Sequence, residues 1–135
     1  MGSRQSAVGG SREWAHIESY RDLRVWREAM DLAEFCYKLT GSFPRREIFG
    51  LSAQLRRAAV SVPANIAEGY GRDSTGSYVQ FLKVAQGSLK ELETHLILSA
   101  RLEFAASAEV DAALGRCEMI GKMLRALIRS IQRPA

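Results

Sequence analysis

The sequence predicts an all-α fold, an antiparallel up-down-up-down four-helix bundle. Apolar residues recur at alternating steps of four and three through most of residues 23–132, which is the helical period. Glycine, proline and small polar residues interrupt this pattern near 41–44 and at 69–74. A fourth segment starts after Ser107, which gives four segments in all. Seams with this spacing pack at about 20° to one another, and short connections make successive helices antiparallel.

The first helix is predicted from Leu23 to Leu39, with Asp22 as its N-cap and with Gly41 and Pro44 ending it. It carries two apolar series, one of Val25, Ala29, Leu32, Cys36 and Leu39, and beside it a second of Trp26, Met30, Ala33 and Tyr37. Residues 1–19 are rich in glycine and serine at their start and are predicted to form a disordered tail, followed by the bundle domain over 20–135.

The second helix is predicted from Arg46 to Glu68, with Gly69 ending it. Pro63 lies inside the pattern and removes one backbone hydrogen bond, which predicts a bend. The core seam of this helix is predicted to consist of Ile48, Leu51, Leu55, Ala58, Val62 and Asn65.

The third helix is predicted from Thr75 to Leu102, capped by Ser74, and the fourth from just after Ser107 to Gln132. The seam of the third helix comprises Tyr78, Leu82, Ala85, Leu89, Leu92 and Leu96. The seam of the fourth comprises Val110, Leu114, Cys117, Gly121, Leu124, Ile128 and Ile131.

Two of these helices carry more apolar surface than one seam needs. The first has its second series, and the third has off-seam apolar residues, namely Val79, Phe81, Val84, Ile97 and Leu98. A helix that is apolar on more than one side must bury the extra side, which predicts self-association. The alternative is that the third helix is central and is covered within one chain.

Composition limits the remaining classes. The 135 residues, 47% of them hydrophobic, suit one globular domain. No apolar run is long enough for a membrane span, and residues 1–12 do not resemble a signal peptide. Two cysteines are too few for a disulfide framework. The expected location is therefore the cytoplasm, with both thiols reduced.

Motifs for catalysis, metals and cofactors are weak. Glu91 and Glu93 stand at the wrong spacing from His95 for a di-iron carboxylate site. The glycines at 69–71 follow a helix, whereas a dinucleotide-binding loop follows a strand. Cys36 and Cys117 fall on apolar seams, which favours a structural role. We therefore expect no enzymatic activity, no metal and no cofactor.

Asn65 falls on the predicted seam of the second helix, with Glu68 one turn later. A buried amide without a partner costs about 1–3 kcal/mol, so a partner is expected. Two interpretations stay open: a polar pocket at the bend made by Pro63, or a buried network that fixes which helices pair.

The positive charge is the remaining chemical feature. The net charge is +4, and arginine dominates the basic residues. Arginine suits bidentate contacts to phosphate. The candidate nucleic-acid-binding residues are Arg56, Arg57, Arg72, Lys122, Arg125 and Arg129, and Lys83 and Lys90 are further basic residues of the third helix. The last three candidates follow Asp111 and Glu118 along the fourth helix, an order that also complements the helix dipole. For a single chain two interpretations stay open: a phosphate-binding surface, or an order of charges that only complements the helix dipole. In a ring of several copies the repeated positive charges would sum.

Several stretches together resemble a known family. They are Leu23-Arg24-Val25-Trp26, Phe43-Pro44, Gln54-Leu55-Arg56-Arg57-Ala58-Ala59, residues 60–69 (VSVPANIAEG) and residues 87–93 (GSLKELE). These residues resemble the bacterial four-helix-bundle family encoded by intervening sequences in large-subunit ribosomal RNA genes, to which the accessory variability protein of diversity-generating retroelements is related. The resemblance covers about residues 20 to 131.

The resemblance implies an antiparallel four-helix bundle that assembles into a pentamer. It also implies a basic surface that, in the retroelement branch, binds a reverse transcriptase and nucleic acid. It implies a structural or subunit-interface role for the motif residues, which are Gln54, Arg56, Arg57, Asn65, Glu68, Glu91 and Glu93.

Together these features predict a non-enzymatic homo-oligomer that binds RNA or DNA, mainly at its phosphates. The alternative is a protein-interaction scaffold, for example an accessory subunit of a reverse transcriptase. A third hypothesis, a small enzyme that uses Asn65 and Glu68, meets few of the criteria for a catalytic site.

Overall fold

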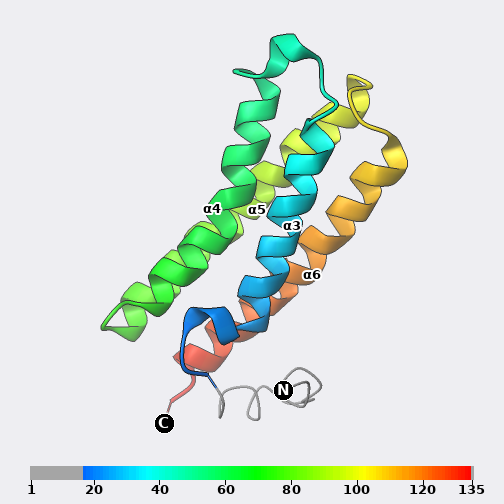
Figure 1. The fold of residues 1–135 in the computed structure, drawn as a ribbon. Helices are drawn as coiled ribbons and strands as arrows, with labels where there is room; N and C mark the ends of the chain where they lie inside the picture. The colour runs from blue at the N-terminus through cyan, green and yellow to red at the C-terminus, as the bar shows by residue number, and fades with distance from the viewer. Residues whose placement is uncertain (1–16, 135) are drawn as a thin grey trace.

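A computed structural model describes residues 17–134 of the chain (Figure 1). Within them the elements are η1 (Tyr20–Asp22), α3 (Arg24–Thr40), η2 (Arg45–Glu47), α4 (Leu51–Tyr70), α5 (Thr75–Arg101) and α6 (Ser107–Gln132). Figure 1 shows α3, α4, α5 and α6 running alternately up and down. The all-α class is confirmed. Most of the predicted tail, residues 1–16, lies outside the described residues.

The four long helices close into a ring. α4 packs against α3 and α5, and α6 packs against α5 and α3. Every helix contributes fully buried large side chains to one common core, such as Leu32, Leu55, Leu92 and Leu124. Burying one such leucine contributes about 1.5–3 kcal/mol. None of the described helices is apolar enough over a sufficient length to cross a bilayer.

The start of α3 differs from the prediction. Asp22 is not the N-cap of α3, because its carboxylate accepts hydrogen bonds from the backbone N–H groups of Glu18 and Ser19, at 2.9 and 3.2 Å. It belongs to the capping box of η1, and Leu23 precedes α3 without a side-chain cap. The first apolar series of α3 is buried as predicted, whereas Met30 and Tyr37 of the second series stay 44% and 47% exposed.

α4 begins at Leu51, five residues later than predicted. The Oε1 atom of Glu47 accepts a hydrogen bond from the Leu51 N–H at 3.0 Å and so caps the helix from a separate 3₁₀ turn. A Cβ atom on Gly50 would lie 2.8 Å from that oxygen, so glycine lets the carboxylate approach the start of the helix this closely. Ile48 therefore lies outside α4 and is exposed rather than part of the core seam.

The end of α4 also corrects the prediction. Gly69 does not end the helix, which continues to Tyr70 and is capped by Gly71. Gly69 is buried against α5, where a Cβ atom would lie 2.8 Å from the Cβ of Phe81. The glycine thus serves close packing of two helices. α4 also continues through Pro63, which is buried.

α5 and α6 agree with the predicted ranges to within a residue. The Oγ of Ser74 accepts a hydrogen bond from the Ser77 N–H at 3.1 Å and caps α5, as predicted. The off-seam apolar residues of α5 divide into two groups. Val79 is buried and Phe81 is half-buried, but Val84, Ile97 and Leu98 are 42–44% exposed, so one chain covers only part of this surface.

Candidate nucleic-acid interface

Three of the predicted binding residues lie on one exposed side of α6. Lys122, Arg125 and Arg129 follow one another at steps of three and four, so their side chains form one row. All three are exposed, and none forms an ion pair with another residue of 17–134. Their charges are therefore not neutralised by direct contacts within the described part of the chain.

A groove of ≈ 790 Å³ runs between α5 and α6 beside this row. Arg125 lines it from α6, and Lys90 lines it from α5. Gly87 and Gly121 also line it, and because they contribute no side chains, the space between the helices stays open. Glu93 of α5 and Glu118 of α6 line the same groove, so each helix contributes one cation and one acid to it.

Lys83 and Lys90 extend the positive surface along α5. They are separated by two helical turns, so they lie on the same stripe of that helix. Both are exposed, and Lys90 pairs with Glu93 at 3.3 Å while its side chain stays 76% exposed. We call Lys83, Lys90, Lys122, Arg125 and Arg129 the α5–α6 basic face. Lys83 and Lys90 are not among the six binding residues predicted from the sequence, although their spacing of seven residues places them on one stripe of a helix.

The other three predicted cations are engaged within the bundle. The Nε of Arg56 donates to the Thr40 hydroxyl at 2.7 Å, and its guanidinium lies 4.8 Å from the ring centroid of Tyr37. Arg72 pairs with Glu68 at 3.1 Å and lies 4.5 Å from the centroid of Phe81.

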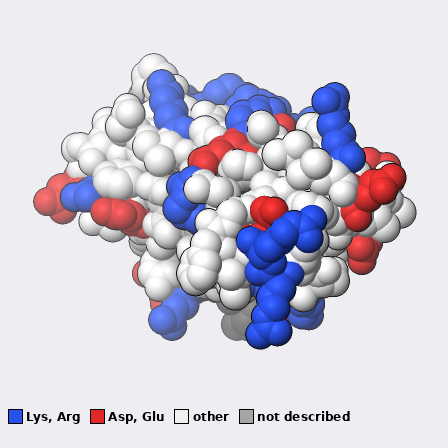
Figure 2. Space-filling view, turned by 90° about the horizontal axis from the view of Figure 1, so that it is seen from above, with Lys and Arg blue, Asp and Glu red and all other residues white. Residues whose placement is uncertain are grey.

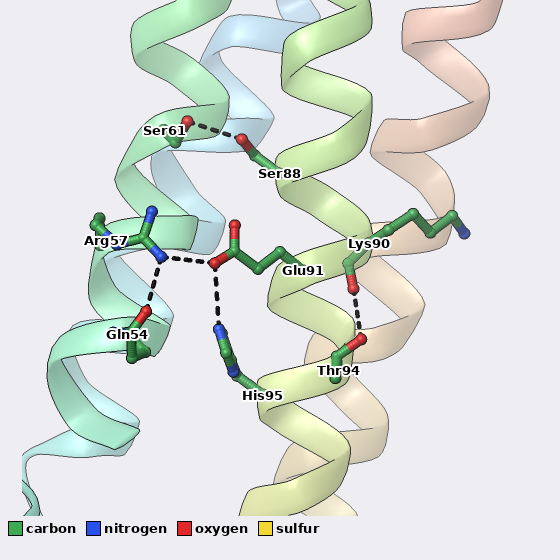
Figure 3. Close-up of polar contacts among 8 residues, drawn as sticks. All are labelled: Gln54, Arg57, Ser61, Ser88, Lys90, Glu91, Thr94 and His95. Carbon is green, nitrogen blue, oxygen red and sulfur yellow. Dashed lines mark hydrogen bonds and ion pairs between the residues drawn. The ribbon is translucent and has the colours of Figure 1, made fainter. Parts of the chain in front are cut away.

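Arg57 is held most closely. Its Nη2 atom lies 2.6 Å from Glu91 Oε2 and donates a second hydrogen bond to Gln54 Oε1 at 2.7 Å (Figure 3). These contacts give Arg57 a structural role across α4 and α5, and the same is true of Arg56 across α3 and α4.

The predicted polar network is divided into separate groups. Gln54 and Glu91 meet through Arg57, and His95 Nε2 lies 3.5 Å from the same Glu91 oxygen (Figure 3). The hydrogen bond from Arg57 holds the pKa of Glu91 below its ordinary value, although burial acts in the opposite direction. Glu68 contacts Arg72, and Glu93 contacts Lys90, so these two acids belong to other pairs.

Asn65 is half-buried beside the seam, and Ile66 takes the core position. The amide of Asn65 donates to the carbonyl and the hydroxyl of Ser61, at 2.8 and 3.0 Å. Ser61 in turn shares a hydrogen bond with Ser88 of α5 at 2.7 Å (Figure 3). The expected partner of the amide therefore exists, and the group links α4 to α5.

Reactive and metal-binding groups are sparse in the described chain. Cys36 and Cys117 are buried, and burial raises the pKa of each thiol to about 12. Among residues 17–134 no three histidine, cysteine or acidic side chains gather as metal ligands.

Comparisons with known proteins agree with this fold. The model of a family described as 23S rRNA-intervening sequence protein matches residues 21–126. One similar solved structure is a protein of unknown function from the S23 ribosomal protein family of Bacteroides thetaiotaomicron VPI-5482. It has a TM-score of 0.70 and 24% sequence identity, over 78% of this chain and 98% of that chain. That identity supports likeness of fold alone. No curated protein matches the chain significantly.

Proposed function

The chain belongs to the 23S rRNA-intervening sequence protein family, and from this premise we propose that it is a non-enzymatic, self-associating bundle that binds the phosphates of RNA or DNA. The binding surface is the α5–α6 basic face. The observation that carries the proposal is the row of Lys122, Arg125 and Arg129, whose charges have no acidic partner among residues 17–134.

The expected recognition is electrostatic. Exposed lysine and arginine side chains displace counterions from a nucleic-acid backbone, so the affinity falls steeply with salt. Contacts to phosphates position a protein but do not read sequence. The family name of the matched model refers to 23S rRNA, which makes a structured RNA hairpin a suitable first probe.

The test compares RNA affinity between variants of equal charge. We expect Arg125→Glu/Arg129→Glu to lose most of the affinity for an RNA hairpin at low salt. The matched control is Arg24→Glu/Lys38→Glu, which reverses two exposed charges on α3. Because both double variants change the net charge equally, a loss confined to the α6 variant identifies the surface. Equal losses in both variants, or no binding by the wild type at low salt, would contradict the proposal.

Self-association is the second part of the proposal. Its support is the apolar surface that one chain leaves uncovered: Met30, Tyr37, Val84, Ile97 and Leu98 are 42–47% exposed. Contacts between copies would remove this surface from water at a gain of about 25 cal/mol per Å². The family resemblance further implies five copies, a number that a solution mass measures directly.

A protein-interaction scaffold is the second candidate function. Val60 on α4 is 42% exposed, and Arg56, one turn before it, lies over Tyr37 of α3. Met30, Tyr37 and Val60 are thus exposed apolar residues of two helices that pack against each other, α3 and α4. A partner protein that is retained after nuclease treatment, and is lost with Val60→Glu, would favour this candidate over nucleic-acid binding.

A further inference from the structure

Phe49 is the most exposed large apolar side chain of residues 17–134. Its exposed fraction is 92%, and the neighbouring Ile48 is 54% exposed. Both lie in the connection between α3 and α4, at one end of the bundle. An aromatic ring that is exposed to water adds nothing to the core, so packing within the fold does not explain why an aromatic residue stands at this position.

The turn that carries Phe49 is held by hydrogen bonds on both sides. Before the ring, the N–H of Glu47 donates to Pro44 at 2.9 Å and that of Ile48 donates to Arg45 at 3.2 Å. After it, the Gly50 N–H donates to the Glu47 carbonyl at 2.9 Å, and the Glu47 carboxylate caps α4. The backbone is therefore ordered before any ligand binds, which lowers the entropic cost of a contact with the ring.

Two arginines precede Phe49 in the same connection, by four and three residues. Arg45 and Arg46 are both exposed, and neither pairs with an acid of residues 17–134. The Arg46 guanidinium lies 5.8 Å from the ring centroid of Phe104, on the connection between α5 and α6. Figure 2 views this end of the bundle and shows basic side chains among uncharged surface, with acidic groups both at the sides and near the middle of the view.

From this arrangement we propose that Phe49 is a stacking platform for an unpaired nucleobase, and that Arg45 and Arg46 bind the phosphates beside that base. An exposed aromatic ring flanked by cations is the combination with which proteins hold single-stranded nucleic acid. Unpaired bases are also the parts of RNA that offer a free face for stacking. The inference rests on the proposed function, but it assigns a different place on the molecule and a different form of the ligand.

A second copy of the chain is a less favourable occupant. Two-fold pairing of this end would bring the Arg45 and Arg46 side chains of both copies together, and like charges in contact oppose association. A head-to-tail contact avoids that repulsion, so the experiment includes it as an outcome.

The experiment uses Phe49→Trp as a probe in the full chain. We expect its added fluorescence to be quenched by single-stranded oligouridine, and not by an abasic oligonucleotide of equal length and charge. The wild type, which contains Trp14 and Trp26, provides the background signal. We further expect Phe49→Ala to weaken oligouridine binding on the order of 10-fold while it leaves binding of a blunt RNA duplex unchanged.

The outcomes separate this inference from the proposed function. If oligouridine binds but the Phe49→Trp signal does not change beyond the abasic control, the stacking role is wrong and phosphate binding stands. If Phe49→Ala lowers the solution mass and leaves oligouridine affinity unchanged, Phe49 is a subunit contact and the inference is overturned. If the wild type binds neither oligouridine nor the RNA hairpin, the proposed function fails and this inference fails with it.

Discussion

Arg57 Nη2 on α4 lies 2.6 Å from Glu91 Oε2 on α5, and this pair spans the most extensive helix–helix contact of the bundle. One α-helical turn along α4, Ser61 meets Ser88 of α5 at 2.7 Å. Together the two contacts fix the register of the helices. Arg57, which the sequence predicts as a phosphate ligand, is held by contacts within the fold. The binding proposal therefore rests on the α6 cations.

Glu91→Gln should lower the free energy of unfolding by at most about 1 kcal/mol, since both partners are partly exposed and solvent screens the pair. The native pKa of Glu91 lies below its ordinary value. The Arg57–Glu91 pair therefore stabilises the fold fully at pH values above the ordinary pKa of a glutamate. This contribution is lost as the pH falls through the native pKa. Urea denaturation at pH 7 and at pH 3 should therefore show a difference between wild type and variant that shrinks at low pH.

The matched control for Glu91→Gln is Glu34→Gln, whose Lys38 partner is 4.0 Å away and exposed. It should change the free energy of unfolding less at pH 7. A difference between wild type and Glu91→Gln that grows as the pH falls would contradict the assigned role of the Arg57–Glu91 pair.

Gly69→Ala should destabilise the protein by about 1–3 kcal/mol through overpacking. The added methyl group would lie 2.8 Å from the Phe81 Cβ and 3.2 Å from the backbone oxygen of Tyr78, and a backbone atom cannot swing aside as a flexible side chain can. Gly115→Ala is the control, because nothing lies within 4 Å of its added carbon in the described chain. That helix-interior change should stabilise by about 0.5–1 kcal/mol. If both substitutions change the free energy of unfolding in the same direction, the close-packing role of Gly69 is refuted.

Both thiols should resist modification in the folded protein. Burial raises the pKa of Cys36 and Cys117 to about 12, so almost no thiolate is present at pH 8. A chromogenic disulfide reagent should titrate no thiol in native buffer and both thiols in concentrated guanidinium chloride. Rapid native reaction at either cysteine would show that the bundle opens far more readily than its packing indicates.

Self-association predicts a solution mass several times the 15.0 kDa of one chain. Light scattering across a range of protein concentrations measures it, and the family resemblance implies a pentamer. A monomer that persists at high micromolar concentration would mean that Val84, Ile97 and Leu98 remain in water. The self-association part of the proposal would then be withdrawn.

Much of the fold was predictable because periodicity depends on local spacing. The ranges of α5 and α6 and the buried series of α3 followed from it. The ends of α4 did not, since its start depends on a cap from Glu47 and its end on how closely Phe81 approaches Gly69. Both features require the folded arrangement.

The candidate site was only partly predictable for the same reason. The row on α6 could be read from spacing, but its position beside Lys90 depends on how α5 and α6 pack. The pairing of Arg57 with Glu91 joins residues far apart in sequence, and no local pattern distinguishes it from a free arginine. The exposure of Phe49 likewise depends on the turn that separates it from α4.

The slope of log binding constant against log salt concentration, for an RNA hairpin, tests the central claim most directly. If Lys122, Arg125 and Arg129 each contact a phosphate, they should contribute about −2 to −3 to the wild-type slope per subunit. Arg125→Glu/Arg129→Glu should reduce its magnitude by about 2. A slope near zero, or the same slope in wild type and variant, would show that these cations do not bind the backbone.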